Sequence, residues 1–212
     1  MGKWFARIYD GLMSPLERHG LHGIRKSLIS GASGVVLEIG AGTGVNFPLY
    51  REAGKVIATE PQQDMLERAR LKARQAKAPI EVLQADAQAL PFDDHIFDTV
   101  VCTLALCTIP DPIQALREVR RVCKTDGKLL LLEHVRLDQP LLGGLQDALT
   151  PVWKHLCDGC HLNRDPVRML RDTGFEVVRC EPHYRKLFLE IEAVNKSVEA
   201  HGSGGGNVAF NR

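Results

Sequence analysis

The chain has 212 residues, with 27 Lys and Arg against 26 Asp and Glu, which gives a formal net charge of +1. That length is enough for one α/β domain with a sizeable core and too short for two ordinary domains. A composition of 44% hydrophobic and 25% charged residues is typical of a globular protein. No apolar run approaches the roughly 20 residues that span a bilayer. The balanced charge argues against a nucleic-acid partner, because phosphate neutralisation needs a surplus of Lys and Arg.

The cysteines and the N-terminal residues predict a cytoplasmic protein. Six cysteines lie in apolar or helical contexts, which favours reduced thiols. Residues 1–25 lack the apolar core of a signal peptide. Cys157 and Cys160 form a C-x-x-C pattern with His155 and His161 beside it. No second ligand pair follows at a zinc-site spacing, so we expect no metal.

Residues 1–29 predict a helical lid. Apolar side chains recur there at helical spacing, at Trp4, Phe5, Ile8, Tyr9, Leu12 and Met13. Five basic residues against two acidic ones over residues 1–26 give this segment a local charge of +3. Such a helix can pack over a ligand, with Tyr9 reaching it, or lie in a lipid interface through residues 1–13. The two interpretations are compatible, because a lid that opens onto a bilayer would admit a hydrophobic ligand.

From residue 30 onward, strands and helices alternate. We expect strands over 35–39, 55–60, 80–85, 97–104 and 128–135, and helices over 46–53, 62–75, 113–123 and 166–173. Near-continuous apolar strands of this kind belong in a parallel sheet that is covered on both faces. Asp126-Gly127 is expected to turn the chain into the fifth strand.

Two segments depart from this alternation. The long stretch 136–162 is rich in Gly and Pro and predicts an inserted lid. Strands at 175–180 and 184–194, joined by a turn at Glu181-Pro182-His183, predict an antiparallel edge hairpin.

The predicted fold is therefore α/β: a Rossmann-like, doubly wound sheet of seven strands, mostly parallel, within residues 30–196. The Gly- and Ser-rich residues 197–212 are expected to form a flexible tail.

A glycine-rich turn follows the first predicted strand, in the run EIGAGTG at residues 38–44. Gly40, Gly42 and Gly44 let the backbone pass close to a ligand, and a following helix would offer its N-terminal amides. The dinucleotide fingerprint G-x-G-x-x-G requires a small third residue where this chain has Val45. This mismatch argues against an NAD-dependent oxidoreductase.

Acidic residues end the next two predicted strands. Glu60 ends the second strand, and Pro61 after it fixes a turn. A carboxylate at this position can accept hydrogen bonds from both ribose hydroxyls of an adenosine. Asp86-Ala87 ends the third strand, where the carboxylate can receive an adenine amino group or cap the following turn.

Together these motifs resemble the class I S-adenosylmethionine-dependent methyltransferases. The resemblance covers about residues 30–195 and is carried by VLEIGAGTG, Glu60, ADAQALPFDDHIFDTVVC and LLLLEHV. Tyr9-Asp10 and the segment PVWKHLCDGCHLNRDPVRMLRDTGFEVV are similar to the UbiE-like branch. Within that branch the chain most resembles the methyltransferase-like thiol methyltransferases and the bacterial phospholipid N-methyltransferases. The resemblance implies S-adenosyl-L-methionine as cofactor and a small, hydrophobic acceptor, with a thiol or a phospholipid amine favoured.

The resemblance also implies which residues contact the cofactor, namely Tyr9, Glu38, Gly40, Ala41, Gly42, Gly44, Asn46, Glu60, Pro61, Asp86, Ala87, Thr103 and Leu104. The glycine turn would hold the methionine part, with Glu38 orienting it. Glu60 would bind the ribose and Asp86 the adenine. Thr103 and Leu104 would offer backbone to the methionine amino group. No Asn/Asp-Pro-Pro-Tyr motif follows the fourth strand, so a nucleic-acid base or a glutamine amide is not expected as acceptor.

Methyl transfer from a sulfonium is an in-line displacement, so the protein supplies orientation, desolvation and, where needed, a base. The candidate bases are His134, His155 and His161. His134 comes first, because the carboxyl ends of parallel strands face the ligand crevice. A non-catalytic nucleotide-binding or membrane-docking module with the same fold is the alternative. The glycine turn together with Glu60 and Asp86 favours the enzyme.

Overall fold

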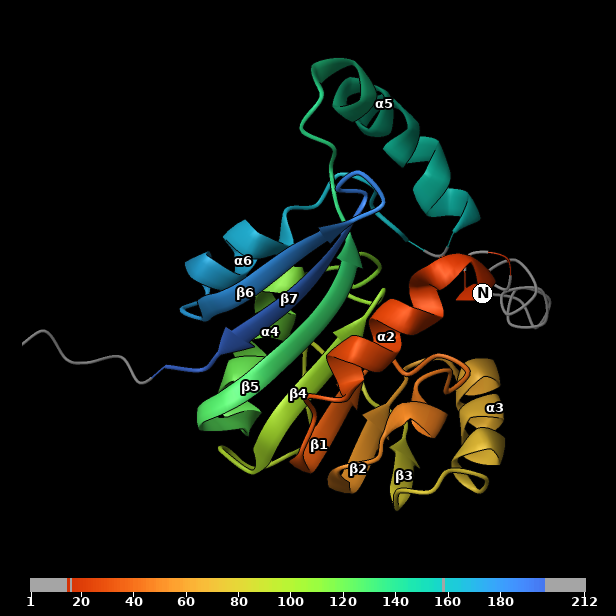
Figure 1. Ribbon diagram of the computed structural model, residues 1–212, viewed down its shortest axis with the longest axis vertical. Coiled ribbons are helices and arrows are strands. Elements are labelled where there is room, and N and C mark those ends of the chain that lie inside the picture. Colours follow the sequence, from red (N-terminus) through yellow and green to blue (C-terminus); the bar gives the residue numbers. More distant parts are fainter. Residues whose placement is uncertain (1–14, 16, 158, 197–212) are drawn as a thin grey trace, which may run out of the picture.

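Seven strands form a single sheet in the computed structural model, which describes Pro15, residues 17–157 (Leu156 by its backbone alone) and residues 159–196. The strands are β1 (Gly34–Ile39), β2 (Ala53–Thr59), β3 (Ile80–Leu83), β4 (Phe97–Thr103), β5 (Cys123–His134), β6 (Glu176–His183) and β7 (Phe188–Val194). Their order is β3-β2-β1-β4-β5-β7-β6 (Figure 1). Neighbours from β3 to β5 pair in parallel, whereas β7 is antiparallel to both β5 and β6. The predicted fold class is confirmed.

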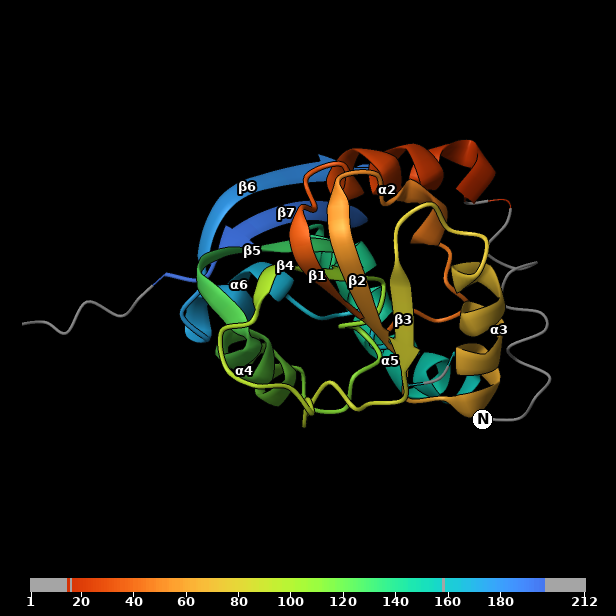
Figure 2. The ribbon, with the colours of Figure 1, turned by 90° about the horizontal axis from the view of Figure 1, so that it is seen from below.

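Helices cover both faces of the sheet (Figure 2). They are η1 (Glu17–Leu21), α2 (His22–Ile29), η2 (Phe47–Leu49), α3 (Gln63–Ala73), α4 (Pro112–Val122), α5 (Pro140–Leu156) and α6 (Pro166–Asp172). Consecutive strand residues point to opposite faces, so one strand serves two cores. In β5, Leu129 and Leu131 pack in the core that includes α4 and α6, and Leu130 and Leu132 in the one that includes α2 and α3. This is why residues 129–132 of β5 are all apolar and do not alternate with polar residues.

Two helices start at an Asp-Pro pair. The Asp111 carboxylate accepts a hydrogen bond from the backbone N–H of Gln114 at 3.0 Å, and Pro112 occupies the first helical position of α4. Asp165 and Pro166 do the same at the start of α6. An N-cap side chain satisfies a helix amide that has no intrahelical partner, and proline has no such amide to lose. These two helices therefore begin where their sequences predict.

The predicted helix over 46–53 is wrong, because the chain there forms only the 3₁₀ turn η2. Asn46 is buried, and its side chain is held by polar groups beneath the glycine turn. Tyr50 is extended and reaches back into the core, where its hydroxyl donates to Glu38 at 2.9 Å. Because β2 already starts at Ala53, this segment has no length left for a regular helix.

The turn of the edge hairpin lies later than predicted. Glu181, Pro182 and His183 pair with β7 as part of β6. The chain instead reverses over residues 184–187, where Tyr184, Arg185 and Lys186 all have positive φ. Pro182 is tolerated because β6 is the edge strand and needs no donor on its outer side.

The predicted Asp126-Gly127 turn lies inside β5, which begins at Cys123. The β4–β5 pairing is interrupted there, with Phe97 opposite Cys123 and Thr99 opposite Lys128. Asp126 has a φ of +60°, so the residues between these pairs form an irregularity in the strand.

The helix α5 fills most of the predicted insert 136–162 and lies beyond the carboxyl end of β5, away from the sheet (Figure 1). Gln146 anchors α5 to the neighbouring loops. Its side chain accepts a hydrogen bond from the N–H of Leu137 at 2.7 Å and donates to the carbonyls of Val135 and Leu162. Large apolar side chains on α5 are exposed, at Leu141, Leu142, Leu145, Leu149, Val152 and Trp153. Within the described ranges, no helix has the length and apolarity needed to cross a membrane.

Tyr9, the apolar residues 4–13 and the tail 197–212 lie outside the described residues.

Candidate active site

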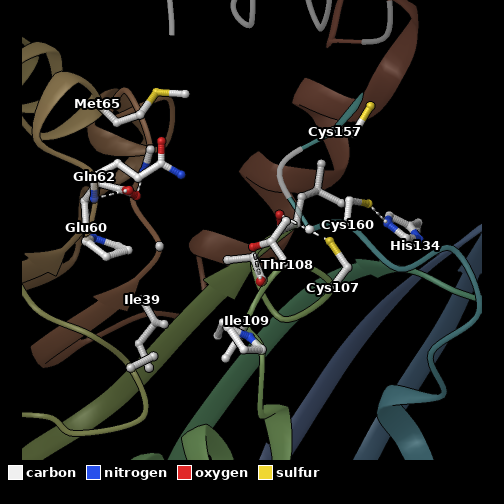
Figure 3. A pocket seen from close by; sticks show the side chains of 18 of the residues that line it. Ile39, Glu60, Gln62, Met65, Cys107, Thr108, Ile109, His134, Cys157 and Cys160 are labelled. Atoms are coloured by element: carbon white, nitrogen blue, oxygen red, sulfur yellow. Dashed lines mark hydrogen bonds between the residues drawn. The ribbon is translucent and has the colours of Figure 1, made fainter. Parts of the chain in front are cut away.

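A cavity of about 730 Å³ lies at the carboxyl ends of the central strands and beneath α5. It opens beside β1 and β4, where the strand order reverses, which is the usual ligand position in open α/β sheets. We call one side of this cavity the glycine-loop end. It is lined by Gly40, Gly42, Glu60, Pro61, Asp86 and Ala87. We call the opposite side the sulfur end. It is lined by Cys107, His134, Cys157 and Cys160. Figure 3 shows Glu60 and Cys160 on opposite sides of this space.

The glycine turn combines close packing with open backbone. Gly40 has a φ of +63°, and a Cβ added there would lie 2.5 Å from the Cβ of Ala105. Any other residue at this position would therefore push the loop after β4 away. Gly42 has a φ of +57°, with no atom within 4 Å of an added Cβ. Gly42 thus leaves its backbone open to a ligand.

Glu60 anchors the glycine turn to the end of β2. Its side chain is buried, and Oε2 accepts a hydrogen bond from the N–H of Gly42 at 2.9 Å. Oε1 accepts from the N–H of Gln62 at 3.0 Å. Both oxygens of this carboxylate thus hold the end of β2 and the glycine turn together at the cavity wall.

A buried polar network supports the turn from behind. Glu38 accepts a hydrogen bond from the Asn46 side chain and another from the Tyr50 hydroxyl, both at 2.9 Å. Burial raises the pKa of Glu38 to about 7, although these two donors and Arg25 act in the opposite direction. Glu38 lies outside the cavity lining. The structure thus gives it contacts that position the turn.

Arg25 belongs to this network and was not singled out from the sequence. It is buried in α2, and its Nη1 donates to Thr103 Oγ1 at 2.6 Å and to Asn46 Oδ1 at 3.2 Å. With Ala41, Asn46 and Thr103 it lines a smaller cavity of about 230 Å³ on the other side of the glycine turn. The helical pattern of residues 1–29 did not distinguish this arginine from the exposed ones near it.

Asp86 both lines the cavity and caps the turn that follows it. It is exposed, and its Oδ1 accepts from the backbone N–H of Gln88 at 2.9 Å. The Gln88 amide also donates to Asp86 at 3.0 Å. Both sequence interpretations of Asp86 are therefore compatible with the structure.

Three segments that are distant in the chain meet at the sulfur end. Cys107 follows β4, His134 is the last residue of β5, and Cys160 follows α5. His134 Nε2 lies 3.0 Å from Cys160 Sγ, and these two atoms and Cys107 Sγ all lie within 4.8 Å of one another. A backbone hydrogen bond from His161 N to Cys107 O, at 2.9 Å, fixes the two loops together.

These contacts favour the thiolate form of Cys160. A hydrogen bond from Cys107 contributes most, and with His134 and the Trp153 indole it lowers the pKa of Cys160 to about 4, against the effect of burial. Burial lowers the pKa of His134, but the hydrogen bond and the charge of Cys160 outweigh it, so the pKa of His134 is raised. The pair therefore resembles the thiolate and imidazole pairs of reactive cysteines.

Glu133 shapes the loop that carries Cys107. Its Oε1 accepts hydrogen bonds from the N–H groups of Ala105 at 2.9 Å and Leu106 at 2.8 Å. Glu133 is buried, and burial raises its pKa. The sequence signal for this role is an acidic residue directly after the four consecutive leucines of β5.

The three candidate histidines occupy different surroundings. His134 lines the cavity. His155 is exposed on α5, with Nδ1 2.6 Å from the carbonyl of Pro151. His161 has Nδ1 2.7 Å from the carbonyl of Gly159. Neither His155 nor His161 is part of the cavity lining.

Comparison with known proteins identifies the family. A family model described as a methyltransferase domain matches residues 37–131. The thiol S-methyltransferase TMT1B of Rattus norvegicus is 35% identical over 171 residues, which cover 77% of this chain and 70% of that protein. The phosphatidylethanolamine N-methyltransferase of Cereibacter sphaeroides is 33% identical over 171 residues, which cover 80% of each. The chain belongs to the class I S-adenosylmethionine-dependent methyltransferases.

The methyltransferase also matches UbiE of Escherichia coli O1:K1, with 32% identity over 202 residues, 82% of this chain and 80% of that one. A SAM-dependent methyltransferase of Thermotoga maritima has the same fold, with a TM-score of 0.65 at 23% identity over 92% of this chain and 100% of that one. The predicted family, enzyme class and cofactor, S-adenosyl-L-methionine, are confirmed. The oxidoreductase and the non-catalytic module are thereby excluded. The residues fit this cofactor, since open glycine backbone, Glu60 and Arg25 offer donors, a carboxylate and a cation around one loop.

Proposed function

We propose that this methyltransferase methylates a small hydrophobic acceptor, a thiol in the first place and a phospholipid amine in the second. The observation that carries this proposal is a single cavity that joins the glycine-loop end to the sulfur end. When bound, S-adenosyl-L-methionine supplies a methyl group on a sulfonium. The names of the relatives, a thiol S-methyltransferase and a phosphatidylethanolamine N-methyltransferase, support the two acceptor classes.

The charges around the cavity favour the thiol. Among the described lining residues, the carboxylates are Glu60 and Asp86, and both belong to the glycine-loop end. Among the described residues, the sulfur end therefore has no carboxylate to pair with the ammonium of a lipid headgroup, and the sulfur of Cys160 is already paired with His134 at 3.0 Å. Its other walls are mostly apolar, with Ile109, Leu162 and Phe188 among them. A neutral, apolar thiol meets no unpaired charge there.

The same geometry supports the cofactor contacts that we propose. Glu60 accepts hydrogen bonds from the ribose hydroxyls, and Asp86 with Ala87 receives the adenine. The carbonyls of Thr103 and Leu104 accept from the amino group, because the Leu104 N–H is already bonded to Leu132 O at 2.7 Å. The Arg25 guanidinium, between the Thr103 and Asn46 side chains, faces the carboxylate of the methionine part.

His134 is the proposed proton acceptor. A thiol must lose its proton to become a strong nucleophile. His134 lines the cavity, and the adjacent Cys160 thiolate stabilises the imidazolium that forms when His134 takes that proton. Cys160 thus acts as a positioning residue that makes His134 a stronger base. Gln146 and Trp153 are the described residues of α5 that line the cavity, and they cover part of it.

An acceptor panel tests the proposal. The full chain is incubated with S-adenosylmethionine carrying a CD₃ group and with an apolar thiol, a phosphatidylethanolamine, a quinol or a phenol. Mass spectrometry then measures labelled product, and S-adenosylhomocysteine release measures turnover. Labelled thioether as the main product supports the proposal. Labelled amine, ring carbon or ether at a higher rate than thioether would overturn the thiol assignment and leave the family assignment intact.

We also propose that the cytoplasmic enzyme contacts membranes through residues 1–13, so that a hydrophobic acceptor arrives from lipid. The apolar and basic pattern of that segment supports this, and so does the exposed apolar row of α5. Flotation with anionic and neutral liposomes, comparing the whole chain with one lacking residues 1–13, tests it. Salt-sensitive binding that disappears on truncation is expected, and absence of binding by the whole chain would contradict it.

A further inference from the structure

The sulfur end holds two thiols that belong to different loops and converge in one cavity. Cys160 is half-buried and lines the cavity beside His134, and Cys107 lines it from the loop after β4. Their sulfur atoms lie within 4.8 Å of each other, and Cys107 hydrogen-bonds to Cys160. The remaining cysteine of this end, Cys157, belongs to no such cluster within the described part of the chain. This arrangement pairs a thiolate with a second thiol at close range.

We propose that Cys160 and Cys107 form a reversible disulfide when the enzyme meets a hydroperoxide, and that this disulfide switches the methyltransferase off. Redox-sensing cysteines are thiolates that a small oxidant can reach and that have a resolving thiol beside them. Cys160 meets the first two conditions and Cys107 the third. The switch lies at the acceptor side of the reaction, so its effect on activity rests on the proposed function, whereas disulfide formation itself does not.

The chemistry is a two-electron oxidation of the two thiols. The Cys160 sulfur attacks one oxygen of the peroxide, the O–O bond breaks, and the other oxygen leaves and is protonated to water or to an alcohol. Cys160 is then a sulfenic acid. The Cys107 sulfur attacks the Cys160 sulfur, the S–O bond breaks, and the oxygen leaves as water with the Cys107 proton. In sum, two thiols and one hydroperoxide give a disulfide, water and water or an alcohol.

The contacts favour this role over a metal site made from the same atoms. The Nε2–Sγ separation of 3.0 Å is a hydrogen-bond distance. Two ligands of tetrahedral zinc, with bonds of about 2.0 and 2.3 Å, lie about 3.5 Å apart, so a metal would have to separate the pair. A metal-bound histidine also needs an acceptor for its second ring nitrogen. Nδ1 of His134 is buried with no hydrogen-bond partner among the described residues.

The disulfide would disable the acceptor side in two ways. It removes the negative charge that raises the pKa of His134, so His134 becomes a weaker base. It also draws the Cys160 loop toward Cys107 and narrows the sulfur end. Gly159, with a φ of +79°, precedes Cys160 and gives this loop a residue that can change conformation. The glycine-loop end is untouched, so cofactor binding survives oxidation.

The test uses the reduced full chain and hydrogen peroxide, followed by non-reducing peptide mapping. Trypsin leaves Cys157 and Cys160 together in residues 155–164, so the mapping is done in a Cys157→Ser background as well as in the natural sequence. We expect a cross-link between this peptide and residues 78–117, with a loss of about 2 Da for the two hydrogens removed, and fragment ions that assign the bond to Cys107 and not to Cys102. Methyl transfer should fall with cross-linking and return with dithiothreitol, while S-adenosylhomocysteine binding by calorimetry stays unchanged.

Variants separate the steps. In Cys107→Ser the resolving thiol is gone, so dimedone should trap a sulfenic acid at Cys160. Cys160→Ser should form no disulfide at Cys107. Cys180→Ser, at an exposed cysteine on the far edge strand, is the matched control and should oxidise like the natural chain. A disulfide that forms elsewhere, or no dimedone label at Cys160 in Cys107→Ser, overturns the proposal. One equivalent of tightly held zinc, lost in both cysteine variants, overturns it in favour of a metal site.

Discussion

The glycine-loop end and the sulfur end share one cavity but are assembled differently. At the glycine-loop end each functional group directly follows a strand of the parallel sheet, and backbone hydrogen bonds to Glu60 hold the parts together. At the sulfur end the groups come from three segments separated by more than twenty residues, joined mainly by contacts among Cys107, His134 and Cys160. The sheet therefore positions the residues of the glycine-loop end, whereas loops beyond the sheet position most of those of the sulfur end.

This difference matches the division between cofactor and acceptor binding in the proposed function. A cofactor that is the same in every turnover is served by a fixed frame, in which Gly40 packs against the loop after β4. An acceptor that differs between relatives is served by loops, which change at lower cost to the fold. The following four predictions test the two ends separately, from the largest expected effect to the smallest.

Replacing Glu60 by Ala should affect the glycine-loop end most strongly. The variant loses two charge-assisted hydrogen bonds to the ribose, each worth about 1.5 to 3 kcal/mol, so cofactor affinity should fall at least about 100-fold. Calorimetry with S-adenosylhomocysteine measures this loss. Glu52→Gln, at an exposed residue just before β2, is the matched control and should bind like the natural chain. Unchanged affinity in Glu60→Ala with the fold intact would refute the ribose contact.

Glu38→Gln should remove a pH dependence of stability that arises beneath the glycine turn. The pKa of Glu38 is about 7 in the folded state and 4.5 without burial. A carboxyl group whose pKa is raised on folding contributes stability below about pH 4.5 that is lost as the pH rises through about 7. The loss is on the order of 3 kcal/mol. Urea unfolding between pH 5 and 8.5 should show it in the natural chain, whereas an equal slope in the Gln variant would assign it to another group.

Changes at the sulfur end should spare cofactor binding. His134→Ala should lower kcat about 100-fold while calorimetry shows little change in affinity for S-adenosylhomocysteine. In the natural chain kcat should rise with pH as His134 loses its proton, with a midpoint above 6.5 because its pKa is raised. Cys160→Ala removes the stabilising charge, so the midpoint should move to lower pH. A midpoint that stays in place in Cys160→Ala would show that the thiolate does not act on His134.

Arg25→Met gives the smallest of the four effects. Arg25 is already bonded to Thr103 and Asn46, so its proposed contact with the cofactor carboxylate would be one of several interactions at that position. We expect about a tenfold weaker cofactor affinity, equal to about 1.4 kcal/mol. Lys26→Met, at the exposed neighbour on the same helix, is the control. Equal affinities in the two variants would remove Arg25 from the cofactor site.

The sequence predicted the glycine-loop end because its residues are tied to strand ends. A glycine turn after a strand, followed by acidic residues after the next two, is readable from spacing alone. Glu38, Asn46 and Thr103 were placed near this end by the family resemblance. Their arrangement around Arg25 could not be predicted from the sequence. Arg25 lies on α2, far in the sequence from Thr103 of β4, and only the packing of α2 on the sheet brings the two side chains together.

The sequence predicted the grouping of residues at the sulfur end less well. The C-x-x-C pattern groups Cys160 with Cys157. In the structure, Cys160 instead lies beside Cys107 and His134, which are far from it in the sequence. Cys107 follows an apolar strand, where a cysteine usually belongs to the core.

The helix predicted over 46–53 was wrong for a related reason. Burial of Asn46 and Tyr50 against Glu38 outweighed local helix preference.

The most direct test of the two-ended cavity is a crystal structure of the full chain with S-adenosylhomocysteine and the methylated thiol from the acceptor panel. The account predicts the ribose hydroxyls on Glu60, the amino group at the carbonyls of Thr103 and Leu104, and the homocysteine sulfur directed toward the sulfur end. The methyl thioether should lie between that sulfur and His134. A homocysteine sulfur that points away from Cys107, His134 and Cys160, or a product bound outside this cavity, would contradict the account.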